Sequence, residues 1–439
     1  MIPALPAGWN MKRLKFVARV QTGMAKGKDL AGTETVEVPY LRVANVQDGY
    51  LDLAEVTAMP VPVADLPRYR LKPGDVLMNE GGDFDKLGRG HVWHGQIDPC
   101  IHQNHVFAVR PHAVSPEWLN AYTESAPAQF YFMGQAKQST NLASISSSNL
   151  MELPVPLPPE AVQRQLLALI DRETARINAL IEKKTLSIEL LREKRQALIT
   201  QAVTRGLDRD TPLKDSGVDW LGLVPSHWRV MSLKQVVAIP ITDGPHETPE
   251  ACAEGVPFVS AEAVSTGRID FGRIWGFISE EDDARFSKKY RPRRGDIFMV
   301  KSGATTGVTA IVDTDERFNI WSPLAVIRCG DKVLPEFMLN FMRSRNFQEA
   351  IALNWSFGTQ QNIGMGVIGN LRVAVPPIEE QVAAVQQLDV WLSRIASLEL
   401  ATAKSVGLLR ERRAALITAA VTGLIDVRTE VTEEQPEPV

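Results

Sequence analysis

Two pairs of polar loops carry the side chains best suited to bind a ligand in this 439-residue chain. One loop runs from Asn79 to Gly90 and corresponds in position to Val300–Gly307. The other runs from Lys137 to Asn141 and corresponds to Gly358–Asn362. Their glycines let the backbone approach a ligand closely. Arg and Lys pair with guanine or phosphate, Asp and Glu accept from cytosine, and Asn and Gln make two-point contacts to adenine. These residue types make the loops candidates for reading DNA bases.

A third candidate is the Gly-Pro turn Thr242–Thr248, which has low specificity by itself. In the first half of the chain the candidate contact residues are Glu80, Asp83, Lys86, Arg89, Lys137, Gln138, Ser139, Thr140 and Asn141. In the second half they are Thr242, His246, Lys301, Ser302, Thr305, Thr306, Thr359, Gln360, Gln361 and Asn362. Asn and Gln are also common in ordinary surface turns. The basic run Lys288–Arg294 either tracks phosphates or is a solvated strand edge, and both interpretations stay open.

Motifs for catalysis are missing from the sequence. It has no phosphate-binding loop, no Gly-x-Ser-x-Gly elbow, no His-Glu-x-x-His helix and no Asn/Asp-Pro-Pro-Tyr motif of amino-methyltransferases. His91, His94, His102 and His105 lie near Cys100 with zinc-like spacing. The second half keeps none of these histidines, which favours a structural role. We therefore expect no enzyme activity, no metal and no cofactor in this chain.

The sequence contains an internal duplication. Pro6-Ala-Gly-Trp9 recurs as Pro225-Ser-His-Trp228, and Pro73-Gly-Asp-Val-Leu-Met78 recurs as Arg294-Gly-Asp-Ile-Phe-Met299. The longest match is Leu190-Leu-Arg-Glu-Lys-Arg-Gln-Ala-Leu-Ile-Thr-Gln-Ala-Val-Thr204, which returns almost unchanged from Leu408 to Thr422. A period this long is unlike a solenoid array. It indicates a duplicated unit of a globular module plus a helix.

A long helix is predicted after the proline segment of each half, Pro154–Pro159 and Val375–Pro377. Residues 160–204 contain no Gly or Pro, and a coiled-coil spacing of four and three recurs in both helices. The first stripe is Ile177, Ile181, Lys184, Ile188, Leu191, Arg195, Leu198 and Ala202. The second is Ile395, Glu399, Thr402, Val406, Leu409, Arg413, Leu416 and Ala420. Each stripe needs a partner, so we expect the helices to pair, as rods of roughly 65 to 70 Å.

Short strands and helices before each long helix predict an α+β fold in two tandem modules. The expected strands are 36–43, 75–78, 105–110, 256–259, 296–300 and 324–328, with helical stretches at 116–125 and 335–353. The expected domains are module 1 (1–159), helix and linker (160–210), module 2 (211–377), the second helix (378–425) and a disordered acidic tail (426–439).

The overall composition excludes several classes of protein. The net charge is -4, which argues against binding by bulk positive charge. The three cysteines stand far apart, without a Cys-x-x-Cys pair. No stretch approaches the roughly 20 apolar residues of a membrane span, and the N-terminus lacks the pattern of an export signal. We therefore expect a soluble, cytoplasmic protein.

The duplication and the helix ends resemble one family, the DNA specificity subunits of type I restriction-modification enzymes. The marks are the tandem repeat, the Pro-Pro-to-Gln helix openings at Gln163 and Gln381, and the repeated Leu-Leu-Arg-Glu-Lys/Arg-Arg segment. The resemblance implies two tandem α/β target recognition domains, each followed by a long helix, with the helices pairing as an antiparallel coiled coil. It also implies that each domain reads half of a bipartite double-stranded DNA site. Lys137–Asn141 lacks the Gly-Thr-Gln of the second copy, so its contacts are less defined.

The same resemblance implies that the chain works through partner subunits. Two methyltransferase subunits that use S-adenosylmethionine and two motor-nuclease subunits that use ATP and Mg are expected in the complex. The helices set the spacer and dock the methyltransferases, through Leu191, Arg195, Leu198, Leu409, Arg413 and Leu416. The alternative is a coiled-coil adaptor that binds proteins and has no DNA specificity.

Overall fold

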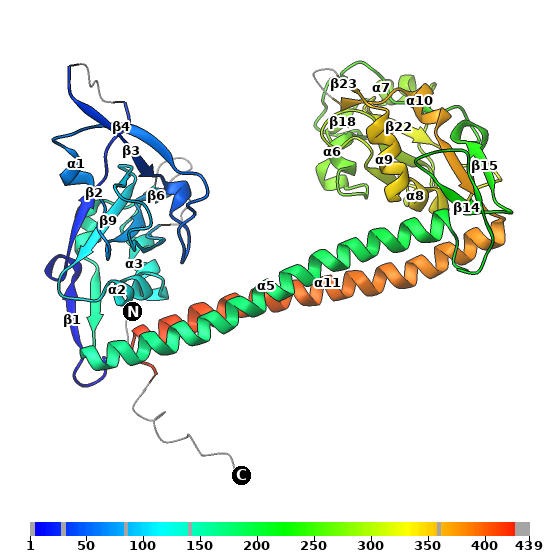
Figure 1. Cartoon of the computed structure of the whole chain (residues 1–439). Helices are drawn as coiled ribbons and strands as arrows, with labels where there is room; N and C mark the ends of the chain where they lie inside the picture. The colour runs from blue at the N-terminus through cyan, green and yellow to red at the C-terminus, as the bar shows by residue number, and fades with distance from the viewer. Residues whose placement is uncertain (1–4, 28–31, 83–86, 139–142, 358–360, 426–439) are drawn as a thin grey trace, which may run out of the picture. The chain divides into compact units, whose positions relative to one another are not determined.

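The computed structural model describes residues 5–27, 32–82, 87–138, 143–357 and 361–425, and the chain divides into two compact units (Figure 1). Unit 1 joins residues 1–185 with 404–439, and unit 2 comprises 186–403. Each unit contains one half of the long helix α5 (Glu160–Thr204) and one half of the long helix α11 (Ile378–Val421).

Unit 1 is built around a four-stranded antiparallel sheet. In sheet order its strands are β2 (Ala18–Thr22), β9 (Val106–Pro111), β5 (Val76–Asn79) and β7 (Gly90–Val92). A second sheet holds β4 (Thr57–Pro62), β3 (Thr35–Leu41) and β8 (Ile101–His102), with β8 parallel to β3. Smaller sheets join β1 (Asn10–Arg13) with β12 (Pro154–Leu157), and β10 (Lys137–Gln138) with β11 (Ala143–Ser144) and β6 (Gly81–Gly82). The helices are α1 (Leu66–Tyr69), α2 (Pro116–Thr123), α3 (Ala126–Gln135) and α4 (Ser147–Met151).

Unit 2 repeats this topology. Its four-stranded sheet has the order β16 (Thr242–Asp243), β22 (Leu324–Ile327), β19 (Ile297–Val300) and β20 (Thr309–Ile311). The second sheet holds β18 (Gly276–Ile278), β17 (Val256–Val259) and β21 (Asn319–Ile320), again with the last strand parallel. The two-stranded sheets are β15 (Arg229–Ser232) with β25 (Arg372–Val375), β23 (Ser356–Phe357) with β24 (Gln361–Asn362), and β13 (Leu213–Asp215) with β14 (Leu223–Pro225). The correspondence of the main sheets confirms the tandem α+β duplication.

The helices of unit 2 are α6 (Ala261–Val264), α7 (Glu280–Phe286), α8 (Pro335–Arg343), α9 (Arg345–Leu353) and α10 (Met365–Asn370). The sequence predicted one helical stretch over 335–353, but the structure breaks it at Ser344. That side chain accepts a hydrogen bond from the backbone N–H of Phe347 (3.3 Å) and so caps the start of α9. Short 3-10 turns occupy Leu14–Phe16, Val43–Asn45, Leu233–Gln235 and Phe271–Arg273.

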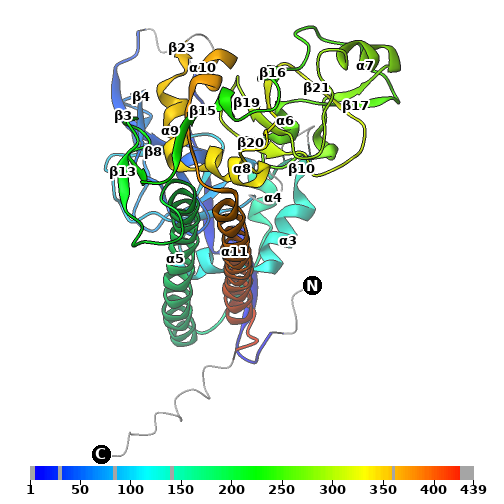
Figure 2. The ribbon, with the colours of Figure 1, turned by 90° about the vertical axis from the view of Figure 1, so that its right-hand side faces the viewer.

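The cores explain why the two long helices run antiparallel. In unit 1, Leu166 and Ile170 near the start of α5 pack in one cluster with Ile417 and Val421 near the end of α11. In unit 2 the ends are exchanged, because Ile199 and Val203 of α5 pack with Ala384 and Leu388 of α11. Figures 1 and 2 show the two helices side by side. The predicted antiparallel coiled coil is therefore confirmed.

The burial of side chains along α5 and α11 agrees with the predicted seam between the two helices. The stripe residues of both helices are buried or half-buried, whereas neighbours outside it such as Leu190 and Leu400 are more than half exposed. The polar stripe residue Arg195 approaches Glu399 at 3.8 Å within unit 2. In unit 1, Arg413 donates to the Oδ1 atom of Asn178 at 3.2 Å. Polar pairs therefore occupy seam positions that the heptad pattern alone assigns to apolar side chains.

Gln381 fastens the start of α11 to unit 2. The side chain is fully buried, donates to the carbonyls of Lys332 and Pro376 (both 2.9 Å), and accepts from the backbone N–H of Leu334 (2.8 Å). Gln163, at the equivalent place in α5, donates to the carbonyl of Pro158 at 3.0 Å. None of the described helices is both long and apolar enough to cross a membrane.

Candidate nucleic-acid interface

In unit 1 the structure brings the first two candidate loops together. Strand β6 follows Glu80 directly and pairs with β11, which pairs with the Lys137 strand β10. A Cβ atom at Gly81 would lie 3.0 Å from the carbonyl oxygen of Ala143, so glycine allows this close pairing. Glu80 is held in place because its Oε2 lies 3.1 Å from the Nδ1 atom of His105. Lys137 is exposed beside this junction.

Unit 2 joins the equivalent loops in the same way. Ser302 forms a β-bridge with Asn362, the backbone N–H of Gly303 donates to the carbonyl of Gln361 (3.0 Å), and that of Ile363 donates to Lys301 (2.9 Å). The side chains of Gln361 and Asn362 are exposed at this junction. Sequence reasoning proposed each loop separately and missed this pairing, because it connects residues about 60 positions apart.

Two threonines of this loop are held by its own turn. The hydroxyl of Thr306 donates to the carbonyl of Gly303 at 2.7 Å, and the carbonyl of Thr305 accepts from the backbone N–H of Val308 at 3.1 Å. Both side chains are half-buried. Gln361 and Asn362 are therefore better placed to meet a ligand than the threonines.

The third loop is anchored to the same junction through a buried carboxylate, Asp243. This residue is fully buried. Its carboxylate oxygens lie 2.5 Å from the Nζ atom of Lys289, 3.1 Å from the Nζ atom of Lys301 and 3.0 Å from the Nε2 atom of His246. Burial raises the pKa of Asp243, but the hydrogen bonds from both lysines outweigh it, so the pKa is lowered overall. A Cβ atom at Gly244 would lie 2.1 Å from the carbonyl oxygen of Ile320, which requires glycine there.

This network places two predicted contact residues in anchoring positions. Only 13% of the Lys301 side chain is exposed, whereas His246 is 67% exposed. Lys301 therefore ties the second-module loop to Thr242–Asp243, and its ammonium group is engaged within the protein. Sequence reasoning missed this partner, because Asp243 and Lys301 are far apart in the chain and no local pattern connects them.

The carbonyl of Arg89 accepts from the backbone N–H of Asn79 at 2.9 Å, next to Glu80. Arg89 lines a cavity of about 600 Å³ together with Asp48 and with residues of both long helices, including Arg410 and Arg413. Arg413 also approaches Asp48 at 3.5 Å. Seven further predicted contact residues lie outside the described part of the chain: Asp83, Lys86, Ser139, Thr140, Asn141, Thr359 and Gln360.

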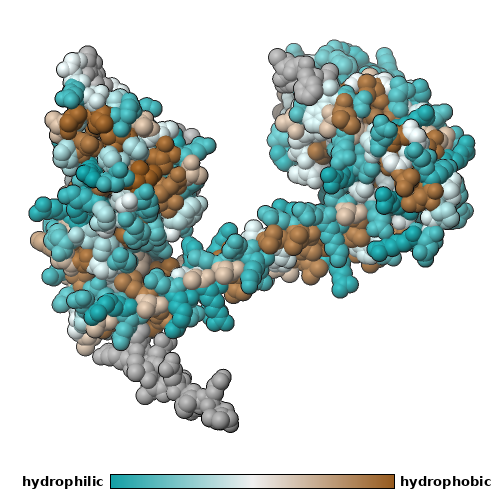
Figure 3. Space-filling view, viewed as in Figure 1, coloured by the Kyte–Doolittle hydropathy of each residue, from teal (hydrophilic) through white to brown (hydrophobic). Residues whose placement is uncertain are grey.

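The six predicted partner-binding residues lie in the helix seam. Leu191, Leu198, Leu409, Leu416, Arg195 and Arg413 are all half-buried between the helices. Sequence reasoning missed the leucines of the two helices that point outward, which are Leu180, Leu186, Leu190, Leu398, Leu400 and Leu408. Figure 3 shows apolar side chains reaching the surface along the helix pair. These outward residues leave the helices a surface that remains free after they have paired.

Two members of the predicted histidine cluster, His91 and His102, have a lowered pKa because they are buried. Burial lowers the pKa of His102 to about 4, and its Nδ1 lies 2.6 Å from the carbonyl oxygen of Val106. Burial and the neighbouring His94 lower the pKa of His91. Among the described residues, no group of three or more His, Cys, Asp and Glu side chains is arranged to hold a metal ion.

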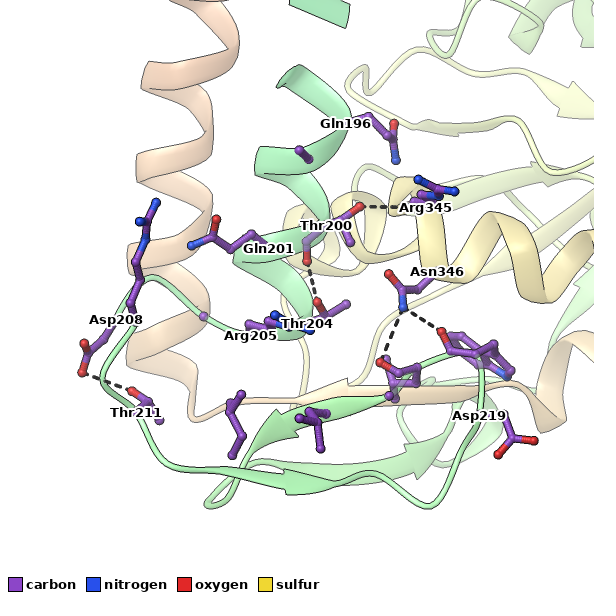
Figure 4. Close-up of a pocket in the computed structure, with 18 of the residues that line it drawn as sticks. Gln196, Thr200, Gln201, Thr204, Arg205, Asp208, Thr211, Asp219, Arg345 and Asn346 are labelled. Atoms are coloured by element: carbon purple, nitrogen blue, oxygen red, sulfur yellow. Dashed lines mark hydrogen bonds between the residues drawn. The ribbon is translucent and has the colours of Figure 1, made fainter. Parts of the chain in front are cut away.

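A cavity of about 1030 Å³ lies in unit 2 where α5 ends (Figure 4). The backbone N–H of Arg345 donates to the hydroxyl of Thr200 at 2.9 Å, and Asn346 donates to the carbonyl of Trp220 at 2.7 Å. These bonds tie α9 both to α5 and to the linker between the repeats. The polar groups seen there make structural contacts, and the sequence assigned no function to this region.

Comparison with known proteins shows which proteins this chain resembles. The model of the family "Type I restriction modification DNA specificity domain" matches residues 225–404. The EcoBI specificity subunit of Escherichia coli is 22% identical over 400 residues, which cover 89% of this chain and 81% of that protein. The EcoKI specificity subunit of E. coli K12 is 19% identical over 406 residues, 90% and 84% of the two chains. The putative MjaX specificity subunit of Methanocaldococcus jannaschii is 22% identical over 283 residues, and the match spans 62% of its length.

Solved structures share the fold over nearly the whole chain. A chain from the work "Structural basis underlying complex assembly and conformational transition of the type I R-M system" superposes with a TM-score of 0.72 at 19% identity, covering 96% of this chain and 100% of that one. The HsdS subunit from Thermoanaerobacter tengcongensis gives a TM-score of 0.54 at 18% identity, covering 96% and 99%. The chain is thus homologous to the specificity subunits of type I restriction-modification systems, which confirms the resemblance seen in the sequence.

Proposed function

We propose that this chain is the non-catalytic DNA-reading subunit of a type I restriction-modification complex, in which each module reads one half of a bipartite site. The observation that carries the proposal is the duplicated loop junction. The loop after β5 pairs through β6 with β11 in unit 1, and the loop after β19 pairs with β24 in unit 2. Two equivalent binding edges on one chain suit a recognition site in two parts.

The side chains at the two junctions differ, which supports two different half-sites. Unit 1 presents Glu80 and Lys137, whereas unit 2 presents Gln361 and Asn362. Amide side chains make two-point contacts to adenine, while carboxylate and ammonium groups suit cytosine and guanine. Each lost two-point contact is expected to cost about 1 to 3 kcal/mol of discrimination.

The long helices are proposed to dock the methyltransferase subunits and to set the spacer between half-sites. The stripe residues of the two helices pack against each other. The methyltransferase subunits are therefore proposed to bind outward leucines such as Leu190 and Leu400, which are 55% and 74% exposed. S-adenosylmethionine, ATP and Mg are assigned to the partner subunits, because the sequence lacks the motifs that bind them.

Co-expression with a type I methyltransferase subunit encoded beside this chain tests the proposal. Methylated adenines would be mapped across the genome by single-molecule sequencing. We expect a split motif with a constant spacer. An intact complex that methylates no such motif would instead favour an adaptor that binds proteins through the helices.

A further inference from the structure

A basic ridge recurs in both units outside the reading loops. In unit 2 it is the outward-facing part of the run Lys288–Arg294, namely Lys289, Arg291 and Arg293. The equivalent residues of unit 1 are Arg68, Arg70 and Lys72, at the same distance from the repeated Gly-Asp of β5 and β19. All six side chains are exposed. We propose that this basic ridge binds the phosphate backbone of DNA, independently of base sequence.

The ridge begins at the end of a helix, with Arg68 in α1 and Lys289 in the turn after α7, and buried residues lie between its basic ones. Tyr69 and Leu71 are buried between the three basic residues of unit 1, and Tyr290 is buried between Lys289 and Arg291 of unit 2. The hydroxyl of Tyr290 donates to Asp296 at 2.5 Å. From Arg70 and Arg291 onward, the alternation of exposed basic residues with buried or half-buried ones turns the basic side chains outward on one edge.

A buried ion pair fixes the backbone of the ridge in both units. In unit 1, Asp75 pairs with Arg110 (2.6 Å) and accepts from the backbone N–H of Lys72 (2.8 Å), while Arg110 donates to the carbonyl of Arg70 (3.4 Å).

In unit 2, Asp296 pairs with Arg328 (2.6 Å) and accepts from the backbone N–H of Arg293 (2.8 Å), while Arg328 donates to the carbonyl of Arg291 (3.0 Å). The same three interactions therefore hold the same backbone segment in each repeat. A rigid backbone lowers the entropy lost when the side chains bind an extended ligand.

Two of the six ridge cations are ion-paired within the protein, Lys289 with Asp243 and Arg70 with Asp98. Within the described part of the chain, Lys72, Arg291 and Arg293 have no acidic partner at ion-pair distance. Arg70 pairs with Asp98, but both side chains are about half exposed, and such pairs are weak. Polyanions rather than single anions suit a row of spaced cations on an edge.

The position of the ridge favours DNA over an acidic protein as the polyanion. Lys289 contacts Asp243, which also holds Lys301 at the base of the reading loop in unit 2. In unit 1 the side chain of Gln21 donates to the carbonyl of Arg68. Gln21 lies on β2, the strand that corresponds to β16 in unit 2. A duplex read at the loops therefore lies beside the ridge, so this inference rests on the proposed DNA-reading function.

The test compares DNA binding by the assembled complex of this chain with its methyltransferase subunits. The variants are R70Q/K72Q and R291Q/R293Q, and the control is R229Q/R345Q, which removes two exposed charges of unit 2 away from the ridge. Binding to a duplex with the target site and to a random duplex is measured from 50 to 200 mM salt. Assembly with the methyltransferase is measured by size-exclusion chromatography with light scattering.

We expect each ridge variant to lower the slope of log K against log salt by about 0.9 per lost phosphate contact, or about 1.8 for the pair, and to weaken binding by about tenfold at 200 mM. The loss should be equal for target and random duplexes, with assembly unchanged. An unaltered slope, an equal loss in R229Q/R345Q, or a loss that follows failed assembly would overturn the ridge proposal. If the unmodified complex showed no preference for any site, the proposed function would fail, while the salt slopes on random DNA would still decide the ridge.

Discussion

Replacing Arg328 by Met should destabilise unit 2 more than any loss of a surface charge. Asp296 is 1% exposed and receives the Nε and Nη2 atoms of Arg328 at 2.6 and 2.7 Å. Met keeps most of the apolar stem but removes both donors, which leaves a carboxylate in the interior with only the Tyr290 hydroxyl and one backbone N–H. Breaking a buried ion pair from one side costs about 3 to 5 kcal/mol of unfolding free energy.

The chain offers a matched control in the same unit. Arg294 and Asp315 also form a close pair, with Nη2 to Oδ2 at 2.8 Å, but their side chains are 55% and 78% exposed. R294M should therefore leave stability unchanged, because solvent screens and replaces an exposed pair. The double variant R328M/D296N should recover part of the loss, since it removes the unpaired buried charge.

Hydrogen exchange of the amides in β19, followed over a guanidinium series, measures the opening of unit 2 alone. The account predicts a large fall in protection for R328M, none for R294M, and partial recovery in the double variant. Equal protection in R328M and R294M would refute the claim that this buried pair fixes the module.

Two further predictions concern the helices. Burial and the nearby Asp48 raise the pKa of Glu124 to about 7, although Arg413 and a hydrogen bond from Asn120 act to lower it. The folded state therefore binds this proton more tightly than the unfolded state. The free energy of unfolding should consequently fall as the pH rises from about 4.5 to about 7. The E124Q variant should lose this pH dependence, and at pH 8 its free energy of unfolding should exceed that of the unmodified protein by up to about 3 kcal/mol, measured by denaturant titration. An unchanged pH profile in E124Q would contradict the raised pKa of Glu124. Adding seven residues after both Thr185 and Ala403 lengthens each helix by about 10 Å and should lengthen the recognised spacer by about three base pairs. A methylation map with the original spacer would rule out a spacing role for the helices.

The parts of the fold that repeat locally were predictable from sequence. The helix seam follows from spacings of three and four residues, and the structure places Ile177 and Ile395 in buried seam positions. The duplication follows from matching segments in the same order, and the four-stranded and three-stranded main sheets of the two units agree strand for strand.

Long-range contacts were not predictable in this way. Nothing in the local sequence connects Asp243 with Lys301, so a residue expected to face a ligand is instead largely engaged inside the protein. Arg89 lies beside Arg413 in a cavity for the same reason, because the α11 residues that meet it are more than 300 positions away. The ridge residue Arg70 was missed because the identity in this segment is short, limited to Tyr69-Arg70 against Tyr290-Arg291.

The central claim is that each module reads its own half of the site, and a methylation map of loop variants tests it most directly. Q361A and N362A would be compared with N370A, an exposed change in unit 2 outside the loops, in the co-expressed complex. The account predicts relaxed sequence in one half-site only, by about 1 to 3 kcal/mol of discrimination per lost contact, with the other half and the spacer unchanged. An unaltered motif in both variants, or equal relaxation of both halves, would contradict it.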